Sequence, residues 1–283
     1  MKYAIELWAA GVGDARTLAE LAQLAEDSGW DGIFLEDYIT HWYGKETYDP
    51  WVALAAMAMS TKYIRLGTAV TPLPRRRPWK LAREAVTLDH LSNGRLILGV
   101  GLGGTKDPLN FDRLGEATDM KQRAEMADEA LDILIGLWSG EPFSYNGKHY
   151  QVNEVTFLPK PVQKPRIPIW VGGGWPGKPI QRAARFDGFI PYKNTDMPGQ
   201  WKDIQPDEVR TIKAYIEKHR AASTPFDLSF GGRMRSADWE QDRAHIRAMA
   251  QAGTTWWMEF VEPPDVDLEV VRQCIRRGPL CVD

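Results

Sequence analysis

The sequence predicts an α/β protein with the (β/α)8 fold of a TIM barrel. Short apolar segments alternate with amphipathic helical segments from one end of the chain to the other. Eight such strand–helix units fit within the 283 residues, a usual size for this fold. Most of the apolar segments are rich in Ile, Val, Leu and Phe, as expected for parallel strands buried on both faces. We expect a single domain over residues 1–283, with a doubly wound sheet of similar length as the alternative.

The N-terminal half contains the first four expected strands and three expected helices. The first helix begins with Thr17 and Glu20, which are spaced as a capping box, and ends at Gly29. The next two helices begin at Pro50 and Pro78, because proline is tolerated in the first turn of a helix. The strands of this half are expected at residues 3–8, 32–37, 64–70 and 95–101.

In the second half, an insertion at roughly residues 141–166 interrupts the alternation before the fifth strand. It contains Asn146-Gly147 between aromatic and β-branched residues, a strong signal for a β-hairpin. We expect this hairpin at the bottom or the side of the barrel. The other elements are expected as helices at 122–138, 178–186, 206–220, 239–253 and 267–277 and as strands at 167–173, 187–192, 227–232 and 254–261.

Composition excludes several classes of partner. The net charge of −3 argues against nucleic acid or an anionic membrane as the main partner. The longest apolar run, WVALAAMAM, is too short to span a bilayer, and Glu6 interrupts the first apolar segment where a signal peptide needs an apolar core. The only cysteines, Cys274 and Cys281, form no C-x-x-C motif. We therefore expect a cytoplasmic protein.

One motif in the sequence is also found in dinucleotide-binding proteins. Gly99, Gly101 and Gly104 spell G-x-G-x-x-G, the dinucleotide fingerprint, but they follow the fourth strand rather than the first. The polar loop after them is broken by Pro108, and Glu125, at about the expected distance for an acidic partner, lies within a helical pattern. We infer instead that glycines at the end of a barrel strand let a planar ligand approach the backbone. For Gly99, tight barrel packing is an equal alternative.

The barrel mouth is expected to hold many glycines and aromatic rings and few titratable groups. The strand ends supply Glu6, Trp8, Glu36, Asp37, Tyr38, a run of glycines after the fourth and fifth strands, and Glu259. No metal is expected, because the histidines have no metal-ligand spacing; they are His41, His90, His149, His219 and His245. No G-x-S-x-G motif or placed cysteine predicts a nucleophile. Such a mouth favours a cofactor as the carrier of the chemistry.

Two longer segments carry a family resemblance. They are GTAVTPLPRRRPWKLAREAVTLDHLSNGRLILGVGLGG and, later, PRIPIWVGGGWPGKPIQRAARFDGFIP. Together they resemble the bacterial luciferase-like superfamily, whose members are flavin-dependent monooxygenases and deazaflavin-dependent oxidoreductases on a TIM barrel. The resemblance covers nearly the whole chain in strand order, including the insertion before the fifth strand. It does not distinguish one substrate from another.

The resemblance implies catalytic roles for two residues after the second strand. Asp37 takes the position beside the reactive edge of the flavin, although it could instead cap the loop that follows. Where relatives often have histidine this chain has Tyr38, so His41 is the candidate substitute. Trp8, Trp42 and Arg76 are candidates for the wall of a substrate pocket, with packing as the alternative for the tryptophans.

The resemblance also implies the cofactor site. A non-proline cis peptide between Ala69 and Val70 is expected to form a bulge under the flavin ring. Gly101 and Gly103 are expected to form a wall of the site, although some relatives have an arginine for the phosphate where this chain has Leu102. The loop from Gly172 to Lys178 is expected to receive the flavin phosphate, through Gly172, Gly173, Gly174 and Trp175.

The function expected from these features is that of an FMN-dependent monooxygenase which uses O2 to oxygenate a small organic substrate. The alternative within enzymes is hydride transfer with the 8-hydroxy-5-deazaflavin coenzyme and without oxygen. The alternative of another class is a non-catalytic flavin-binding protein. A flavin reductase that supplies reduced cofactor and a second copy of the chain, in a homodimer, are the expected protein partners.

Overall fold

A computed structural model describes residues 1–7, 11–41, 44–104, 107–194, 201–233, 235–261 and 267–282. Within these ranges, eight parallel strands close into the barrel that the sequence predicts, rather than a doubly wound sheet. In order around the barrel they are β1 (Lys2–Leu7), β2 (Gly32–Leu35), β3 (Arg65–Thr68), β5 (Leu96–Gly101), β8 (Ile169–Gly174), β9 (Gly188–Asn194), β11 (Asp227–Arg233) and β12 (Trp256–Val261).

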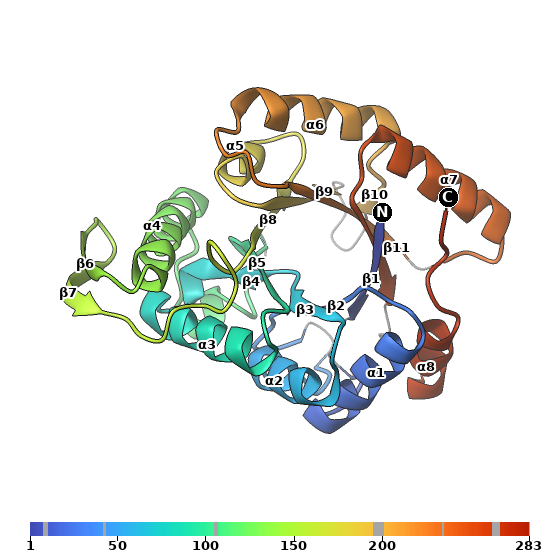
Figure 1. Cartoon of the computed structure of the whole chain (residues 1–283), viewed down its shortest axis with the longest axis horizontal. Coiled ribbons are helices and arrows are strands. Elements are labelled where there is room, and N and C mark those ends of the chain that lie inside the picture. The colour runs from blue at the N-terminus through green and yellow to red at the C-terminus, as the bar shows by residue number, and fades with distance from the viewer. Residues whose placement is uncertain are drawn as a thin grey trace.

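Helices surround the barrel (Figure 1). They are α1 (Ala15–Asp27), α2 (Pro50–Ser60), α3 (Pro78–Leu91), α4 (Met120–Trp138), α5 (Pro179–Ala183), α6 (Pro206–His219), α7 (Trp239–Ala252) and α8 (Leu268–Arg276), with short 3-10 turns η1 (Leu73–Arg75) and η2 (Asp112–Leu114). Two short strands extend the sheet, β4 (Thr71–Pro72) beside β5 and β10 (Trp201–Lys202), antiparallel to β9. None of the helices in the described ranges is long and apolar enough to cross a membrane.

The start of α1 differs from the prediction. The N-cap is Asp14, whose carboxylate accepts hydrogen bonds from the backbone N–H groups of Arg16 and Thr17 at 3.1 and 2.9 Å. The capping box that we predicted from Thr17 and Glu20 is therefore wrong, because an aspartate three residues earlier already satisfies these amide donors. The predicted starts at Pro50 and Pro78 are confirmed.

The insertion forms the predicted hairpin, with strands β6 (Pro142–Asn146) and β7 (Gln151–Thr156). Asn146 ends β6 and pairs with Gln151, and the N–H of Gly147 donates to the carbonyl of Tyr150. Figure 1 shows the hairpin projecting beyond α3 and α4, away from the barrel strands. The insertion therefore lies at the side of the barrel and takes no part in its mouth.

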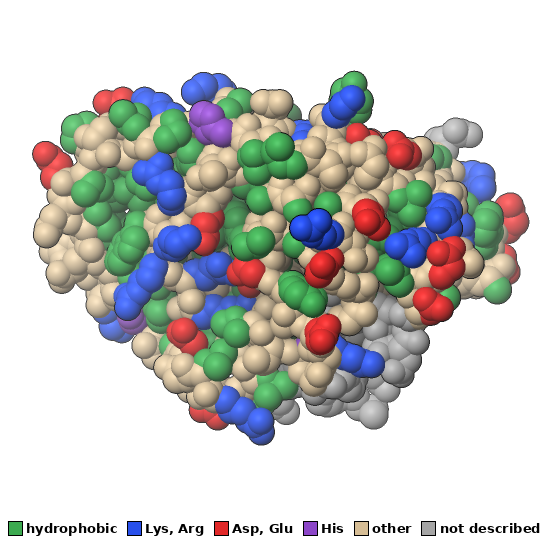
Figure 2. Space-filling model, turned by 90° about the horizontal axis from the view of Figure 1, so that it is seen from below, with side chains coloured by type: hydrophobic (Ala, Val, Ile, Leu, Met, Phe, Trp, Pro, Cys, Tyr) green, Lys and Arg blue, Asp and Glu red, His purple; other side chains and the backbone are tan. Residues whose placement is uncertain are grey.

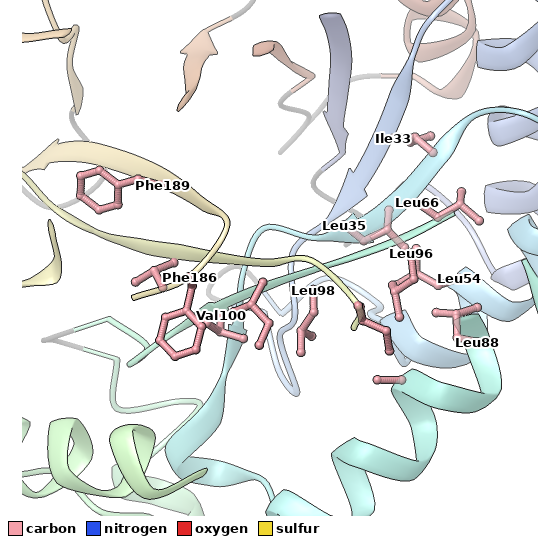
Figure 3. Close-up of a cluster of buried hydrophobic side chains, with 14 of the residues drawn as sticks. Ile33, Leu35, Leu54, Leu66, Leu88, Leu96, Leu98, Val100, Phe186 and Phe189 are labelled. Atoms are coloured by element: carbon pink, nitrogen blue, oxygen red, sulfur yellow. The ribbon is translucent and has the colours of Figure 1, made fainter. Parts of the chain in front are cut away.

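The main core lies between the barrel and its helices. Figure 3 shows Leu54 of α2 and Leu88 of α3 beside Leu66 and Leu96 of the barrel, and all four are buried in one cluster. A second cluster fills the barrel interior itself. Its members are Ala4, Phe34, Ile97, Trp170, Trp256 and Met258, each at most 2% exposed.

Candidate active site

The interior cluster forms a closed floor beneath the barrel mouth. Phe34 and Trp170 stack with ring centroids 5.4 Å apart, and Trp256 meets Trp170 edge-on at 5.3 Å. These rings come from β2, β8 and β12, so they plug the barrel from several sides. Any ligand must therefore bind above them, at the carboxyl ends of the strands, which is where the sequence places its candidates.

One wall of the mouth consists of Val70 and two glycines. The peptide bond between Ala69 and Val70 is cis, as predicted. The side chain of Val70 lies against β5 and β8, since a Cβ added to Gly101 or Gly172 would come within 2.5 or 2.7 Å of a Val70 methyl group. The absence of a side chain at these two glycines leaves room for Val70. The open backbone lies further along β8, at Gly174, where no described atom lies within 4 Å of the Cβ position.

Two other glycines, one in the fourth predicted strand and one in the turn after it, have packing roles. A Cβ at Gly99 would lie 1.9 Å from the carbonyl oxygen of Thr68, so this position serves the close approach of β3 and β5. Gly103 has φ +79°, and a Cβ there would come within 2.3 Å of the Phe111 ring. Phe111, which the sequence did not single out, therefore packs against the turn after β5.

The loop after β8 offers less for a phosphate than the sequence suggested. The helix that follows, α5, has five residues and begins with Pro179, which has no N–H group to donate. Gly173 faces this helix, because its Cβ would lie 2.3 Å from a Pro179 carbon. Only Gly174 points to open space, with no described atom within 4 Å of its Cβ position. Phosphate binding by this loop stays a prediction, with Gly174 rather than Gly173 as its most accessible point.

A carboxylate at position 174 therefore provides the appropriate test of the phosphate site. Gly174→Asp is expected to weaken binding of a phosphate-bearing cofactor at least tenfold without a large loss of thermal stability, because the new side chain enters open space and repels the anion. Gly174→Asn, which has nearly the same size but no charge, is the matched control and should bind the cofactor more tightly than Gly174→Asp does. Fluorescence titration with the cofactor measures both, and equal affinity for the two variants would exclude the loop as the phosphate site.

Trp175 lies next to this loop and is held from two sides. Its backbone N–H donates to the carbonyl of Tyr192 at 2.8 Å, and its side chain hydrogen-bonds to Glu208 at the start of α6. Glu208 also accepts from Lys193 at 2.9 Å. The indole is half-buried, so it forms a fixed part of the rim near the open Gly174 position.

Asp37 lies in a dense ionic network just behind the mouth. Its side chain is 1% exposed and accepts from Arg75 at 2.9 Å, from Arg76 at 2.7 and 2.9 Å and from Thr71 at 2.9 Å. The indole N–H of Trp51 donates at 3.3 Å, and Arg75 also donates to the Asp37 carbonyl. Burial acts to raise the pKa of Asp37, but the adjacent charges of Arg76 and Arg75 outweigh it and lower the pKa. The carboxylate is thus ionised and its oxygens are occupied.

The same network determines where the neighbouring arginine side chains lie. Arg76, the predicted pocket residue, is bound to Asp37 and lies 3.7 Å from Glu84, with 18% of its side chain exposed. The side chain of Arg75 is almost fully buried, while Arg77 is exposed, so the three adjacent arginines do not point the same way. A direct contact between Arg76 and a substrate stays a prediction.

His41 lies at the end of a pinned loop. Asn110 accepts from the backbone N–H groups of Ile39 and Thr40 at 2.8 and 3.0 Å and donates to the Thr40 carbonyl, so the loop after β2 is tied to the loop after β5. His41 is 5% exposed, and its ring meets Tyr38 edge-on at 6.2 Å. Burial, with a smaller effect of Lys45, lowers the pKa of His41, so the ring is neutral at pH 7. Trp8 and Trp42 lie outside the described residues.

Comparison with known proteins places this geometry in a family. The sequence model of the luciferase-like monooxygenase family matches residues 4–257. The chain belongs to this family of enzymes. An F420-dependent glucose-6-phosphate dehydrogenase of Microbacterium testaceum is 32% identical over 185 residues, which is 63% of this chain and 53% of that protein. The chain spans about half the length of the curated relatives that it matches.

Solved structures share the fold of this luciferase-like chain. Monooxygenase RslO1 from Streptomyces bottropensis superposes with a TM-score of 0.76 at 21% identity, over 98% of this chain and 97% of that one. The coenzyme F420 dependent tetrahydromethanopterin reductase from Methanopyrus kandleri gives 0.74 at 17% identity, over 98% of both chains. At these identities the likeness establishes the barrel. It does not distinguish F420 from FMN.

The mouth of the luciferase-like barrel fits a flavin-type ring. The open backbone at Gly174 lies on the wall beyond Val70, above an apolar floor, so a flat ring can approach the main chain. A side chain at this position would obstruct that approach. The fit concerns the ring; binding of the phosphate by the loop after β8 stays a prediction.

Sequence reasoning placed Glu6 at the mouth but did not select it as a site residue. In the luciferase-like barrel its side chain faces the interior near the end of β1, and burial raises its pKa to about 8. A signal was present in the sequence, since Glu6 alternates in phase with Ala4 on a strand that is otherwise apolar beyond Lys2. An acidic residue on the interior face of a barrel strand, near its carboxyl end, is typical of a functional position.

Proposed function

We propose that the chain is a deazaflavin-dependent oxidoreductase that interconverts a small alcohol and its carbonyl product. The observation that carries the proposal is the bare wall beside Val70 above the aromatic floor, which suits a flat redox ring. The choice of coenzyme follows the curated relatives named as F420-dependent, which are 30–32% identical to this chain. A bound deazaflavin would accept or donate two electrons as a hydride, without oxygen.

The residues of this chain would bind and orient that ring. Val70 would contact the ring, while Gly174 would let the ring approach the backbone. The network of Asp37, Arg75 and Arg76 would hold the turn after β4 in place behind the wall. The aromatic floor would keep water from entering the site from below.

The second candidate is the FMN-dependent monooxygenase, favoured by the description of the family whose model matches residues 4–257. It would need O2 and reduced FMN, supplied by a separate flavin reductase. The deazaflavin-dependent enzyme would turn over without O2, the monooxygenase would consume O2 and reduced FMN, and a non-catalytic flavin-binding protein would consume neither.

The test is binding and turnover with each coenzyme. The protein is titrated with F420 and with FMN, and turnover is then followed with glucose 6-phosphate, anaerobically and in air. We expect F420 to bind and to be reduced without O2. Turnover that requires reduced FMN and consumes O2 would replace the proposal with the monooxygenase, and binding without turnover in either condition would favour the non-catalytic protein.

The homodimer stays a prediction, and α2 offers a surface for it. This helix is apolar on nearly all sides, and Val52 and Met59 on its outer face are 65% and 71% exposed, next to Tyr63 at 80%. Figure 2 looks onto the side that carries α1, α2 and α3, where hydrophobic side chains lie among charged ones. A helix that is apolar all round is usually covered.

A charge on this face should therefore prevent self-association. Met59→Glu is expected to convert a dimer into a monomer, because a carboxylate would be buried without a partner in the interface. Val270→Glu on α8, where the residue is 39% exposed, is the matched control and should stay dimeric. Light scattering after size exclusion gives the mass, and a monomeric parent protein at micromolar concentration would contradict the prediction.

A further inference from the structure

Glu6 lies on the interior face of β1 between two aromatic neighbours. It pairs in register with Phe34 of β2 and with Phe260 of β12. Neighbouring residues in register on parallel strands point to the same side of the sheet, and Phe34 belongs to the interior cluster. Ala4, two residues before Glu6, belongs to it as well. The carboxyl group of Glu6 is therefore the first polar group above the floor on this side of the barrel.

No hydrogen bond or ion pair compensates this carboxyl group within the described part of the chain. The carboxylate of Asp37, at the end of the neighbouring strand, accepts from several side chains, whereas that of Glu6 has no partner among the described residues. Burial raises the pKa of Glu6 to about 8, since the apolar surroundings disfavour the ionised form. The residue as a whole is half-buried and is not fully enclosed. It is thus a largely protonated acid at pH 7 that a ligand can reach.

The other titratable groups around the mouth do not neutralise it. By the alternation of β2, Glu36 follows Phe34 on the same face and carries the same sign of charge when ionised. Tyr192 ends the interior face of β9, and burial raises its pKa. The cations Arg75 and Arg76 are held by Asp37, whose position alternates with that of Glu36. Among the described side chains, the mouth therefore presents carboxyl and hydroxyl groups around Glu6.

The strand order sets Glu6 opposite the bare wall. In this barrel, β8 is the fourth strand from β1 in either direction. The backbone of Gly172 and the side chain of Val70 are thus across the interior from Glu6. A ring held at that wall and the side chain of Glu6 would both face the barrel interior, where the substrate would bind.

We propose that Glu6 is the acid–base residue of this site and exchanges a proton with the hydroxyl or carbonyl oxygen of the substrate. The inference rests on the proposed function. In the oxidising direction the O–H bond breaks, the proton goes to a carboxylate oxygen of Glu6, and the O–H electron pair closes the C=O bond. The C–H hydrogen would leave with its electron pair to a bound deazaflavin, which would supply the two-electron acceptor. In the reducing direction, protonated Glu6 returns the proton to the oxygen.

Two readouts test this role, the first without cofactor or substrate. Infrared difference spectra between pH 6 and 10 should show a protonated carboxylic acid that titrates near pH 8 in the parent protein and is missing in Glu6→Gln. Glu154→Gln, on the exposed strand β7, is the control and should keep the band. A Glu6 carboxyl that titrates at the ordinary value of about 4.3 would overturn the proposal.

The second readout is turnover of the enzyme loaded with F420. Glu6→Gln should lower kcat about 10²- to 10⁴-fold while the Kd for F420 stays within about twofold, and Glu6→Asp should retain partial activity. For the parent enzyme, alcohol oxidation should rise with pH towards a plateau above about 8, since the base form is required, and Glu6→Gln should lose this dependence. If Glu6→Gln keeps the full kcat, the acid–base role of Glu6 is overturned but the proposed function is not. A parent protein without turnover with either coenzyme would overturn the proposed function and the acid–base role with it.

Discussion

Asp37→Ala is expected to destabilise the protein by about 3–5 kcal/mol, the usual cost of removing one partner from a buried ion pair. The substitution leaves the guanidinium groups of Arg75 and Arg76 without their common acceptor, and Arg75 is 1% exposed. The thermal midpoint should fall by about 5–15 °C. Denaturant unfolding and calorimetry measure both quantities. A variant within 1 kcal/mol of the parent protein would show that the network contributes little.

A comparison of Asp37→Ala with Asp37→Asn distinguishes a structural role of Asp37 from a catalytic one. Asp37→Asn keeps the shape of the side chain and should lose less stability than Asp37→Ala, because the amide oxygen still accepts hydrogen bonds. If Asp37 acts beside the reactive edge of the cofactor, as the family resemblance implies, turnover per folded molecule should fall in Asp37→Asn as far as in Asp37→Ala. If it is an anchor, turnover should follow the order of stability.

The pH dependence of stability gives an independent test of whether the ionised form of Asp37 stabilises the folded protein. The pKa of Asp37 is lowered in the folded protein, so its contribution is complete above the unfolded value of about 3.9 and is lost as the pH falls through the folded pKa. The difference in unfolding free energy between the parent protein and Asp37→Asn should be constant from pH 5 to 7. It should shrink below about pH 4.

The barrel itself could be predicted because its evidence is local and repeated. Each strand is a short apolar run, each helix has its own start signal, and errors at single ends such as Thr17 leave the strand order intact. The hairpin at Asn146 was predictable for the same reason, since turn chemistry acts over a few residues. The cis bond at Val70 came from family resemblance, and nothing local in the sequence requires it.

The partners of the site residues could not be predicted, because they depend on where side chains meet across the fold. Asp37 is a strand-end carboxylate in the sequence, and only the folded chain shows that two arginines some forty positions later occupy its oxygens. The direction of Gly173 towards Pro179 depends in the same way on the path of a short loop. Glu6 is the opposite case, since its place on the interior face follows from alternation along one strand.

Gly99→Ala should be the most disruptive of the glycine substitutions in the fourth predicted strand. Its Cβ would lie 1.9 Å from the carbonyl oxygen of Thr68, and a backbone atom of a central strand cannot move aside as a flexible side chain can. Thr68 itself donates from its hydroxyl to the Gly99 carbonyl at 2.8 Å, so β3 and β5 are tied at this level. We expect a loss of about 3 kcal/mol or more, the upper end of what overpacking costs.

Gly174→Ala is the control that separates the steric clash at Gly99 from the general effect of replacing a glycine with alanine. It adds the same methyl group to a barrel strand, but with no described atom within 4 Å, so its stability should stay within about 0.5 kcal/mol of the parent protein. Urea unfolding of the two variants gives the comparison. A large loss for Gly99→Ala alone would mean that the first glycine of the apparent dinucleotide fingerprint serves strand packing and binds no nucleotide. Equal stability of the two variants would mean that β3 and β5 can separate at this level, and Gly99 would then return as a candidate ligand contact.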